Sequence, residues 1–335
     1  MQLSAVANTF TVRGFFLNKF SRNMSQCRNI RGMLDKLDQD LKKKKVIVDT
    51  AENILRAAGY NKIETPILEY TSTFLTGVGE TSDIASKEMY CFEDRNGTSV
   101  ALRPEGTAGV TRAFITNNLY KNLPQKLYYT GPMFRYERPQ RGRYRQFDQF
   151  GVEVYGIHSP TADIEVLLMA WEFIKKLDLA KNSIIKLNSL GDKKTRIDYT
   201  SALVKYLQSK KEKLSSDSII RLEKNPLRIL DSKNPDDIDV LLDAPKISNF
   251  YNDYSEKRLA FIKSALDELG LAYELDEKLV RGLDYYDHTV WEFIYQNDSL
   301  GKSQDTILAG GRYNNLVKKM GCTYEVPGIG FCFNY

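Results

Sequence analysis

The sequence predicts an α+β protein in which a mostly antiparallel sheet is flanked by helices. Two alternating runs of residues, joined by a basic loop between Thr130 and Gly156, have the pattern of a β-hairpin. Short strand patterns lie before and after this hairpin, and amphipathic helix patterns lie between them. The 335 residues can form one large domain with an insertion, or two ordinary domains.

The elements before the hairpin follow from periodicity and turn residues. A helix is expected from Leu37 to Ala58, because Gly59 stands in the usual position just past a helix end. Strand patterns follow at Lys62–Glu69, Lys87–Glu93 and Ser99–Arg103. A second helix is expected over Gly106–Asn117, after a turn with the sequence RPEG.

The hairpin separates apolar from polar side chains at a period of two residues. One face of the second run carries Phe150, Val152 and Val154. The other face carries Gln149, Gly151 and Glu153. In the first run, one face is shared by Met133, Arg135 and Glu137. Because Gly151 has no side chain, we expect room for a ligand against the sheet at this point.

The loop that joins the two runs is rich in arginine, with Arg138, Arg141, Arg143 and Arg145. Guanidinium groups bind phosphates through paired N–H donors. The hairpin and its loop therefore predict an anionic substrate that contains a nucleotide.

The second half of the chain first becomes helical and then returns to strands. An amphipathic helix is expected over Thr161–Lys176 and a strand over Ile184–Asn188. The stretch from Lys193 to Leu269 is charged, lysine-rich and almost wholly helical in pattern, which indicates a helical insertion. Strand patterns return after Gly270, from near Tyr273 to the run Tyr324–Phe333.

The charge is distributed unevenly. The formal net charge is +5, and the five basic residues among residues 1–34, which contain no acid, account for the whole excess of 48 over 43. Any contact with RNA must therefore be local. Arginines spaced among apolar residues are typical of a mitochondrial or plastid presequence, so we expect residues 1–29 to be a targeting leader. A disordered N-terminal arm, and with it a cytoplasmic location, is the alternative.

Several classes of site are excluded by composition. The four cysteines form no CxxC pair and the chain has only two histidines, so neither a disulfide framework nor a Cys/His metal site is expected. The apolar runs are too short and interrupted for a membrane span.

Four segments, in order, resemble the histidyl-tRNA synthetases of bacterial type, a class II aminoacyl-tRNA synthetase family. The hairpin resembles motif 2 in the segment FRYERPQRGRYRQFDQFGVE. The first histidine-binding segment of the family is matched by LRPEGTAG, and the signature that gives the family its amino-acid specificity is matched by LVRGLDYYDHTVWEF. The glycine-rich strand-turn that follows is matched by AGGRYNNLV. The resemblance covers about Ile30 to Phe333 and implies the class II antiparallel sheet with a helical insertion.

The resemblance implies a set of residues that bind histidine. They are Glu105, Gly106, Thr107, Arg135, Gln149, Glu153, Arg281, Tyr285 and Tyr286. Arg135 and Arg281 are also implied as catalytic, since in the family they stand at the α-phosphate. The alternative for Arg135 is a structural salt bridge with Glu137. Arg312 and Tyr313 are expected near the same pocket.

ATP, with its accompanying Mg²⁺, is the implied second substrate. The residues implied for ATP are Arg135, Glu137 and Arg143. The residues implied for the acceptor end of tRNA(His) are Arg138, Gln140, Arg141 and Arg145. A homodimer that pairs through the region Thr65–Tyr70 is expected by analogy.

The chain also departs from the family pattern. Asp148 stands where the family usually has histidine, at a position expected to lie in a loop. The chain stops at Tyr335, before the motif 3 arginine and the anticodon-binding domain of the family. Without the helix that would follow, Ile329, Phe331 and Phe333 are expected to risk exposure on a bare sheet face. The implied organisation is a catalytic core of residues 30–190 and 271–335 with an insertion at 191–270.

Three functions fit these observations. The first, favoured by the complete pocket, is a histidine–tRNA ligase that forms histidyl-adenylate and transfers histidine to tRNA(His). The second is a paralogue that acts as the regulatory subunit of an ATP phosphoribosyltransferase. The third is a non-catalytic sensor of histidine or tRNA.

Overall fold

A computed structural model describes residues 28–80, 82–139, 142–296 and 306–335. Most of the expected leader and the loop residues Gln140 and Arg141 lie outside these described residues.

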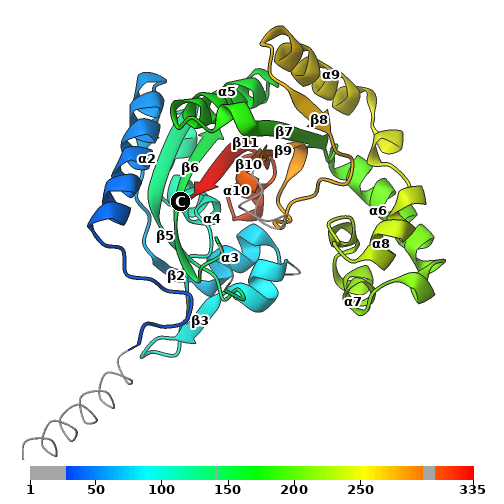
Figure 1. The fold of residues 1–335 in the computed structure, drawn as a ribbon, viewed down its shortest axis with the longest axis horizontal. Helices are drawn as coiled ribbons and strands as arrows, with labels where there is room; N and C mark the ends of the chain where they lie inside the picture. The colour runs from blue at the N-terminus through cyan, green and yellow to red at the C-terminus, as the bar shows by residue number, and fades with distance from the viewer. Residues whose placement is uncertain (1–27, 81, 140–141, 297–305) are drawn as a thin grey trace, which may run out of the picture.

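The main sheet has eight strands in the order β1-β5-β6-β11-β10-β9-β7-β8 (Figure 1). Their bounds are Asn61–Lys62 for β1, Gln125–Phe134 for β5, Gln146–Tyr155 for β6, Ser183–Ser189 for β7, Tyr273–Leu275 for β8, Asp287–Tyr295 for β9, Thr306–Arg312 for β10 and Gly328–Asn334 for β11. Among the described residues, only the outer pairs β1–β5 and β7–β8 are parallel, and the central strands pair antiparallel. The predicted α+β class is confirmed.

A second sheet of three strands lies beside the main one, in the order β2-β4-β3. Its strands span Leu68–Tyr70, Ser99–Leu102 and Tyr90–Glu93 respectively, and both pairings are antiparallel. The helices α3 (Thr71–Val78) and α4 (Thr107–Thr116) pack on it, with Phe74, Ala101 and Ala108 buried between them.

The helices α2 (Asp38–Ala57), α5 (Thr161–Lys176) and α9 (Asp253–Glu268) contribute apolar residues to one core with one face of the main sheet (Figure 1). The apolar side of the hairpin, Phe150, Val152 and Val154, belongs to this core, as expected. The opposite face meets a second core that includes α4, α10 (Leu316–Lys319) and the helices after β7.

The chain between β7 and β8 is helical, as its composition predicts. It forms α6 (Lys193–Gln208), α7 (Ser216–Lys224), α8 (Pro235–Val240) and α9, with short 3-10 turns between them. Several of these helices begin at side chains that accept a backbone N–H, among them Asp192, Ser215 and Asn252. Such caps satisfy donors that the first turn of a helix leaves unpaired.

Three of the expected strands are shorter than their patterns suggest. The pattern at Lys62–Glu69 divides into β1 and the start of β2, separated by irregular chain. Residues 84–88 form a π-helical turn, so β3 begins only at Tyr90. The last strand begins at Gly328 rather than Tyr324. An alternating pattern does not show where a partner strand begins or ends, and pairing sets these limits.

The expected exposure of the last strand is wrong. Ile329, Phe331 and Phe333 are 1%, 3% and 7% exposed. Helix α5 covers them: the ring of Phe173 meets that of Phe333 edge to face at 5.0 Å. Because α5 already lies on this face, the apolar side chains of β11 need no further helix to bury them.

Candidate active site

Glu153 lies at the centre of the candidate site, on the face of β6 that points away from the α5 core. It is 1% exposed. Its Oε1 accepts a hydrogen bond from the Thr107 hydroxyl at 2.6 Å, and its Oε2 accepts one from the Tyr313 hydroxyl. Burial raises the pKa of Glu153 to about 8, although both hydroxyl donors favour the charged form. The carboxyl group therefore titrates near neutral pH.

Glu105 is a second buried carboxylate close to the first. Its two oxygens accept the backbone N–H groups of Thr107 and Ala108, each at 2.7 Å. These are donors of the first turn of α4, whose positive end favours a negative charge. Burial nevertheless raises the pKa of Glu105. Thr107 thus connects the two carboxylates, one through its backbone N–H and one through its hydroxyl.

Glycines provide the space in which the aromatic and acidic side chains of the site lie. A Cβ at Gly151 or at Gly106 would stand 2.2 or 2.1 Å from the Tyr129 ring. A Cβ at Gly330 would meet Glu153 Oε2 at 2.1 Å, and one at Gly328 would meet the Tyr313 ring at 2.1 Å. No side chain fits at these distances, so each glycine is required for its neighbour's position.

The expectation that Gly151 leaves room for a ligand is therefore wrong: the room is filled by Tyr129. This residue was missed by sequence reasoning. Its hydroxyl donates to Gln149 Oε1 at 3.2 Å, and Gln149 Nε2 donates to Asn334 Oδ1 at 3.0 Å. The only sequence signal was the small residue itself, and it does not say which side chain crosses over it.

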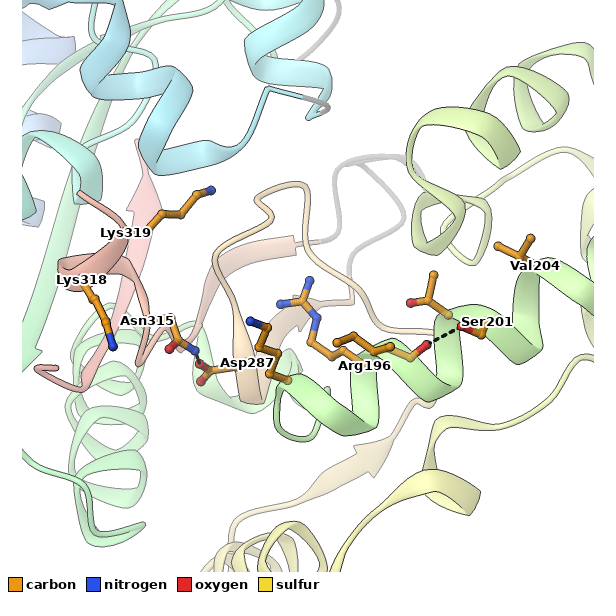
Figure 2. Close-up of a pocket in the computed structure, with 10 residues that line it drawn as sticks. Arg196, Ser201, Val204, Asp287, Asn315, Lys318 and Lys319 are labelled. Carbon is orange, nitrogen blue, oxygen red and sulfur yellow. Dashed lines mark hydrogen bonds between the residues drawn. The ribbon is translucent and has the colours of Figure 1, made fainter. Parts of the chain in front are cut away.

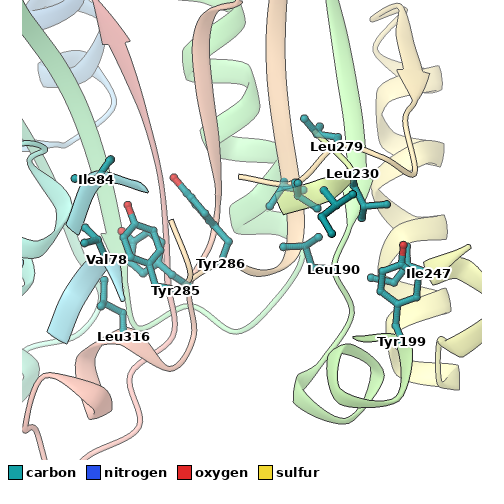
Figure 3. Packing of buried hydrophobic residues seen from close by; sticks show 14 of the residues in the cluster. Val78, Ile84, Leu190, Tyr199, Leu230, Ile247, Leu279, Tyr285, Tyr286 and Leu316 are labelled. Atoms are coloured by element: carbon teal, nitrogen blue, oxygen red, sulfur yellow. The ribbon is translucent and has the colours of Figure 1, made fainter. Parts of the chain in front are cut away.

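Three tyrosines form one wall of the site. Tyr285 and Tyr286 end an irregular segment just before β9, and their ring centroids are 4.6 Å apart. Tyr285 also meets Tyr313 at 5.6 Å. Figure 3 shows Tyr285 and Tyr286 with Val78 and Ile84 among the side chains of one buried cluster. The expected neighbours Tyr285, Tyr286 and Tyr313 are thus brought together.

Two guanidinium groups approach the same part of the sheet. Arg135 donates through Nε to the Pro104 carbonyl at 2.8 Å, and its Nη1 lies 3.8 Å from Glu137 Oε1. Arg281 pairs with Glu292, and its Nε is buried without a partner in the described part of the chain. Burial raises the pKa of the Cys332 thiol, which lies opposite Gly151 in the sheet, to about 11. The positive charges of Arg281 and Arg135 act in the other direction and lower this pKa.

Arg135 and Glu137 do not share a strand face with Met133, as the alternating pattern suggested. The strand β5 ends at Phe134, so both lie in the chain that leaves the sheet. Met133 is fully buried in the core. The salt bridge considered for Arg135 is present, at the long distance given above.

Arg312 points away from the site, in contrast to the expectation. It is fully buried and donates to Asp163 of α5, with its Nη2 2.5 Å from Oδ2. Arg258 of α9 pairs with the same carboxylate. Successive residues of an extended chain point to opposite sides, so Tyr313 reaches Glu153 while Arg312 reaches the helices.

The described part of the hairpin loop is held in place by the Glu137 carboxylate and by the N-terminal segment at Gly32. Arg143 Nη1 is 3.5 Å from Glu137 Oε2, and the Arg143 side chain is half exposed. The Arg145 guanidinium stacks 3.8 Å above the Tyr136 ring, and its backbone N–H donates to the Gly32 carbonyl at 2.7 Å. For Arg138, an exposed residue, no partner occurs within the described residues.

Asp148 does not lie in a loop. It is a buried residue of β6, one position before Gln149. Its carboxylate pairs with Lys36, which precedes α2, and with Lys44 of α2 at 3.0 Å. A carboxylate at this position is tolerated because two lysines compensate its charge.

A cavity of about 760 Å³ lies away from these residues, between α6 and α10 (Figure 2). Lys193, Arg196, Asp287 and Lys319 are among its lining residues, and none of the expected site residues lines it. The residues expected to bind substrate therefore lie around Glu153 and not at this cavity.

The arrangement suits a small polar ligand with an anionic part. Buried carboxylates accept N–H donors, and a pocket built in this way excludes apolar ligands of similar size. Arg135 and Arg281 can compensate negative charge. No group of three or more metal-ligating side chains occurs within the described residues. Within the same residues, no helix has the length and apolar content required to cross a bilayer.

Comparisons with known proteins identify the family. A family model described as histidyl-tRNA synthetase matches residues 32–335. The histidine–tRNA ligase of Rhodospirillum rubrum is 45% identical over 308 residues, which are 92% of this chain and 73% of that protein. That of Pediococcus pentosaceus is 46% identical over 90% of this chain and 71% of its own length.

Solved structures show the same fold. An apo histidyl-tRNA synthetase from S. aureus superposes with a TM-score of 0.74 at 37% identity, over 92% of this chain and 71% of that one. A structure described as an ATP phosphoribosyltransferase regulatory subunit/histidyl-tRNA synthetase, from Bacillus halodurans C, has a TM-score of 0.67 at 23% identity, over 92% and 81%. At that identity the likeness shows the fold alone.

Proposed function

The chain belongs to the histidyl-tRNA synthetase family, and from this premise we propose that it acts as a histidine–tRNA ligase, an enzyme of protein biosynthesis. The observation that carries the proposal is the buried trio of Glu153, Thr107 and Tyr313, within a chain 45% identical to a curated ligase over 92% of its length.

Recognition of histidine is assigned to the two carboxylates. Glu153 accepts an imidazole N–H, and Glu105 receives the ammonium group. The hydroxyls of Thr107 and Tyr313 fix the Glu153 carboxylate in one orientation. Gln149 and the rings of Tyr285 and Tyr286 complete the walls. An amino acid without the polar ring would leave a buried carboxylate unpaired, and this supports selectivity.

Activation joins histidine to ATP. A histidine carboxylate oxygen attacks the α-phosphorus, and pyrophosphate leaves with the bonding electrons. Arg135 and Arg281 stabilise the charge that develops on the phosphate oxygens. Glu137 and Arg143 are assigned to ATP, and Mg²⁺ arrives with ATP as part of the substrate.

Transfer to RNA completes the reaction. A hydroxyl of the terminal ribose of tRNA(His) attacks the histidyl carbonyl, and AMP leaves. The hairpin loop is assigned to the acceptor end through Arg138, Gln140, Arg141 and Arg145, whose guanidinium groups suit phosphates.

The organisation proposed for this enzyme is a catalytic core of residues 30–190 and 271–335 with an insertion at 191–270. The parallel pairing of β7 with β8 supports it, because the chain leaves the sheet and returns beside the same strand. We also propose that residues 1–29 direct import into mitochondria or plastids, on the strength of their acid-free sequence. A cytosolic signal from residues 1–29 fused to a fluorescent protein would contradict this.

The regulatory-subunit alternative is less well supported. The relative that carries that description shares 23% identity, whereas curated ligases share 45–47%. The residues assigned to the histidine pocket are also all present in this chain.

The deciding experiment is histidine-dependent exchange of labelled pyrophosphate into ATP, with the purified chain. Exchange is expected well above that of Glu153→Ala, because this variant removes the imidazole acceptor. Histidine binding is measured in parallel by calorimetry. A folded protein that binds histidine without exchange would be a sensor, and one that does neither would refute the ligase assignment.

A further inference from the structure

The segment Leu279–Tyr286 carries three residues of the site but has no regular secondary structure. Arg281, Tyr285 and Tyr286 all lie on it, and the two tyrosines are 6% and 5% exposed. An irregular segment lacks the ladder of backbone hydrogen bonds that fixes a strand or helix. Its position must therefore come from neighbouring elements.

The turn Asp284–Tyr286 is held from both sides. From α3, the Val78 carbonyl accepts the backbone N–H of Asp284 at 3.1 Å. From the helical stretch after β7, Asn225 Nδ2 donates to Asp284 Oδ1 at 2.9 Å. From α6, Arg196 Nη1 donates to the Tyr286 carbonyl at 2.7 Å and to the Asp284 carbonyl at 3.4 Å. Arg196 thus holds both ends of the turn.

Arg196 is unusual in how it uses its charge. Its guanidinium group donates hydrogen bonds to backbone carbonyls, and the charges of Asp284 and Asp287 lie nearby. Burial lowers its pKa. Burying a cation is unfavourable unless it gains strong hydrogen bonds, so its donors are committed to these two carbonyls.

The position of Arg196 is itself well determined. It lies in the first turn of α6, and Asp192 caps this helix. The Asp192 carboxylate accepts the backbone N–H of Thr195 at 2.8 Å and an N–H from the Asn252 side chain. Figure 2 shows Arg196 reaching from α6 toward the chain that enters β9, beside the cavity described above. The capped first turn of α6 thus presents a fork of donors to an irregular turn.

We propose that Arg196 is a positioning residue of the amino-acid pocket. By binding the carbonyls of Asp284 and Tyr286, it fixes the turn that places the Tyr285 and Tyr286 rings beside Tyr313 and Glu153. The inference rests on the proposed function, since the affected ligand is histidine. It adds a residue of α6 to a site otherwise built from the sheet, α4 and the 279–286 segment.

The test is a comparison of Michaelis constants in the pyrophosphate exchange reaction. Arg196→Met keeps the aliphatic stem but loses the donors. We expect its KM for histidine to rise about tenfold or more, while its KM for ATP changes by less than about twofold. The split is expected because the tyrosine rings form a wall for the amino acid, whereas the residues assigned to ATP, Arg135, Glu137 and Arg143, lie in the hairpin and not on the turn that Arg196 holds. A loss of fold alone would lower the active fraction without changing either constant.

Two variants complete the design. The control is Lys193→Met, one turn earlier on α6. The Lys193 side chain lines the same cavity but makes no hydrogen bond to the described residues, so the constants of this variant should equal those of the parent protein. Arg196→Lys can reach one carbonyl but not both, and its KM for histidine should fall between those of the parent and Arg196→Met. If Arg196→Met fails to fold, Arg196→Lys decides.

The inference is overturned if the folded Arg196 variants keep the parental KM for histidine within about twofold, or if the KM for ATP rises equally. Its failure is separate from failure of the proposed function. If only the inference fails, the parent protein still binds histidine and exchanges pyrophosphate. If the proposed function fails, the parent protein does neither.

Discussion

At the scale of single residues, Glu153 combines two requirements that conflict. A ligand that donates an N–H requires a carboxylate, but a site sealed from water favours the neutral acid. Thr107 and Tyr313 resolve part of this conflict, since both hydroxyls donate to the carboxylate oxygens. The remaining cost of burial leaves the pKa of Glu153 at about 8.

This pKa predicts how stability depends on pH. The folded protein holds the Glu153 proton up to about pH 8, whereas the unfolded chain releases it at its ordinary value. Between these values the folded state binds more protons, so the free energy of unfolding falls as the pH rises. Urea unfolding from pH 5 to 9 should show a loss on the order of 2–4 kcal/mol that is absent in Glu153→Gln. If the free energy of unfolding changed with pH in the same way for the parent protein and for Glu153→Gln, the raised pKa of Glu153 would be refuted.

Arg281 gives a prediction for the chemistry. Arg281→Ala removes a cation assigned to the α-phosphate and should lower pyrophosphate exchange about 100-fold or more. It also leaves Glu292 without its cationic partner, although the Thr306 hydroxyl still donates to it. The double variant Arg281→Ala/Glu292→Gln removes that unpaired charge, and it should recover stability without recovering exchange. Unchanged exchange in a folded Arg281→Ala protein would contradict the assignment.

At the scale of elements, Asp163 connects α5 to both α9 and β10. Its carboxylate is fully buried and pairs with Arg258 and Arg312, which are 95 and 149 residues distant in sequence. This contact fixes the end of β10, and with it the place where Tyr313 leaves the strand.

Asp163→Asn should therefore be strongly destabilising, because two buried guanidinium groups would lose their counter-charge. We expect the free energy of unfolding to fall by about 3–5 kcal/mol, measured by urea unfolding at neutral pH. The matched control is Asp49→Asn, which breaks an exposed pair with Lys45 and should change it by less than about 1 kcal/mol. Equal effects of the two changes would refute the role of Asp163.

The elements also show what the sequence can and cannot predict. Helix α5 was predicted at its observed bounds, because its apolar periodicity and its flanking residues are local signals. The faces of β6 followed from alternation alone. The packing of Tyr129 over Gly151, the ion pairs of Asp163 and the support of the 279–286 segment by Arg196 could not be predicted. They join residues far apart in sequence, and composition does not determine which distant side chain fills a given space.

At the scale of the whole molecule, the three-stranded sheet has one face without a covering element in the described residues. Glu69 and Ala101 point to α3 and α4 and are buried. On the other face, Leu68, Tyr70 and Phe92 are 43%, 63% and 49% exposed. Pairing in register places them on the same side of the sheet. Exposed apolar side chains gathered on one face are typical of interaction surfaces.

We propose that this face, which includes the end of the region Thr65–Tyr70, pairs with a second copy of the chain to form a homodimer. The double variant Leu68→Glu/Tyr70→Glu places carboxylates in the centre of that contact, where burial without partners is costly. Light scattering should then give the monomer mass, while the parent chain gives the dimer mass.

Leu242→Glu is the control, because Leu242 is 69% exposed on the helical stretch after β7, far along the chain from this sheet. It should leave the dimer intact. A dimer that survives the double variant would place the interface elsewhere, and a parent chain that is monomeric at micromolar concentration would refute the dimer itself. Since the sheet packs on α4, whose first turn holds Glu105, dissociation is also expected to weaken histidine binding.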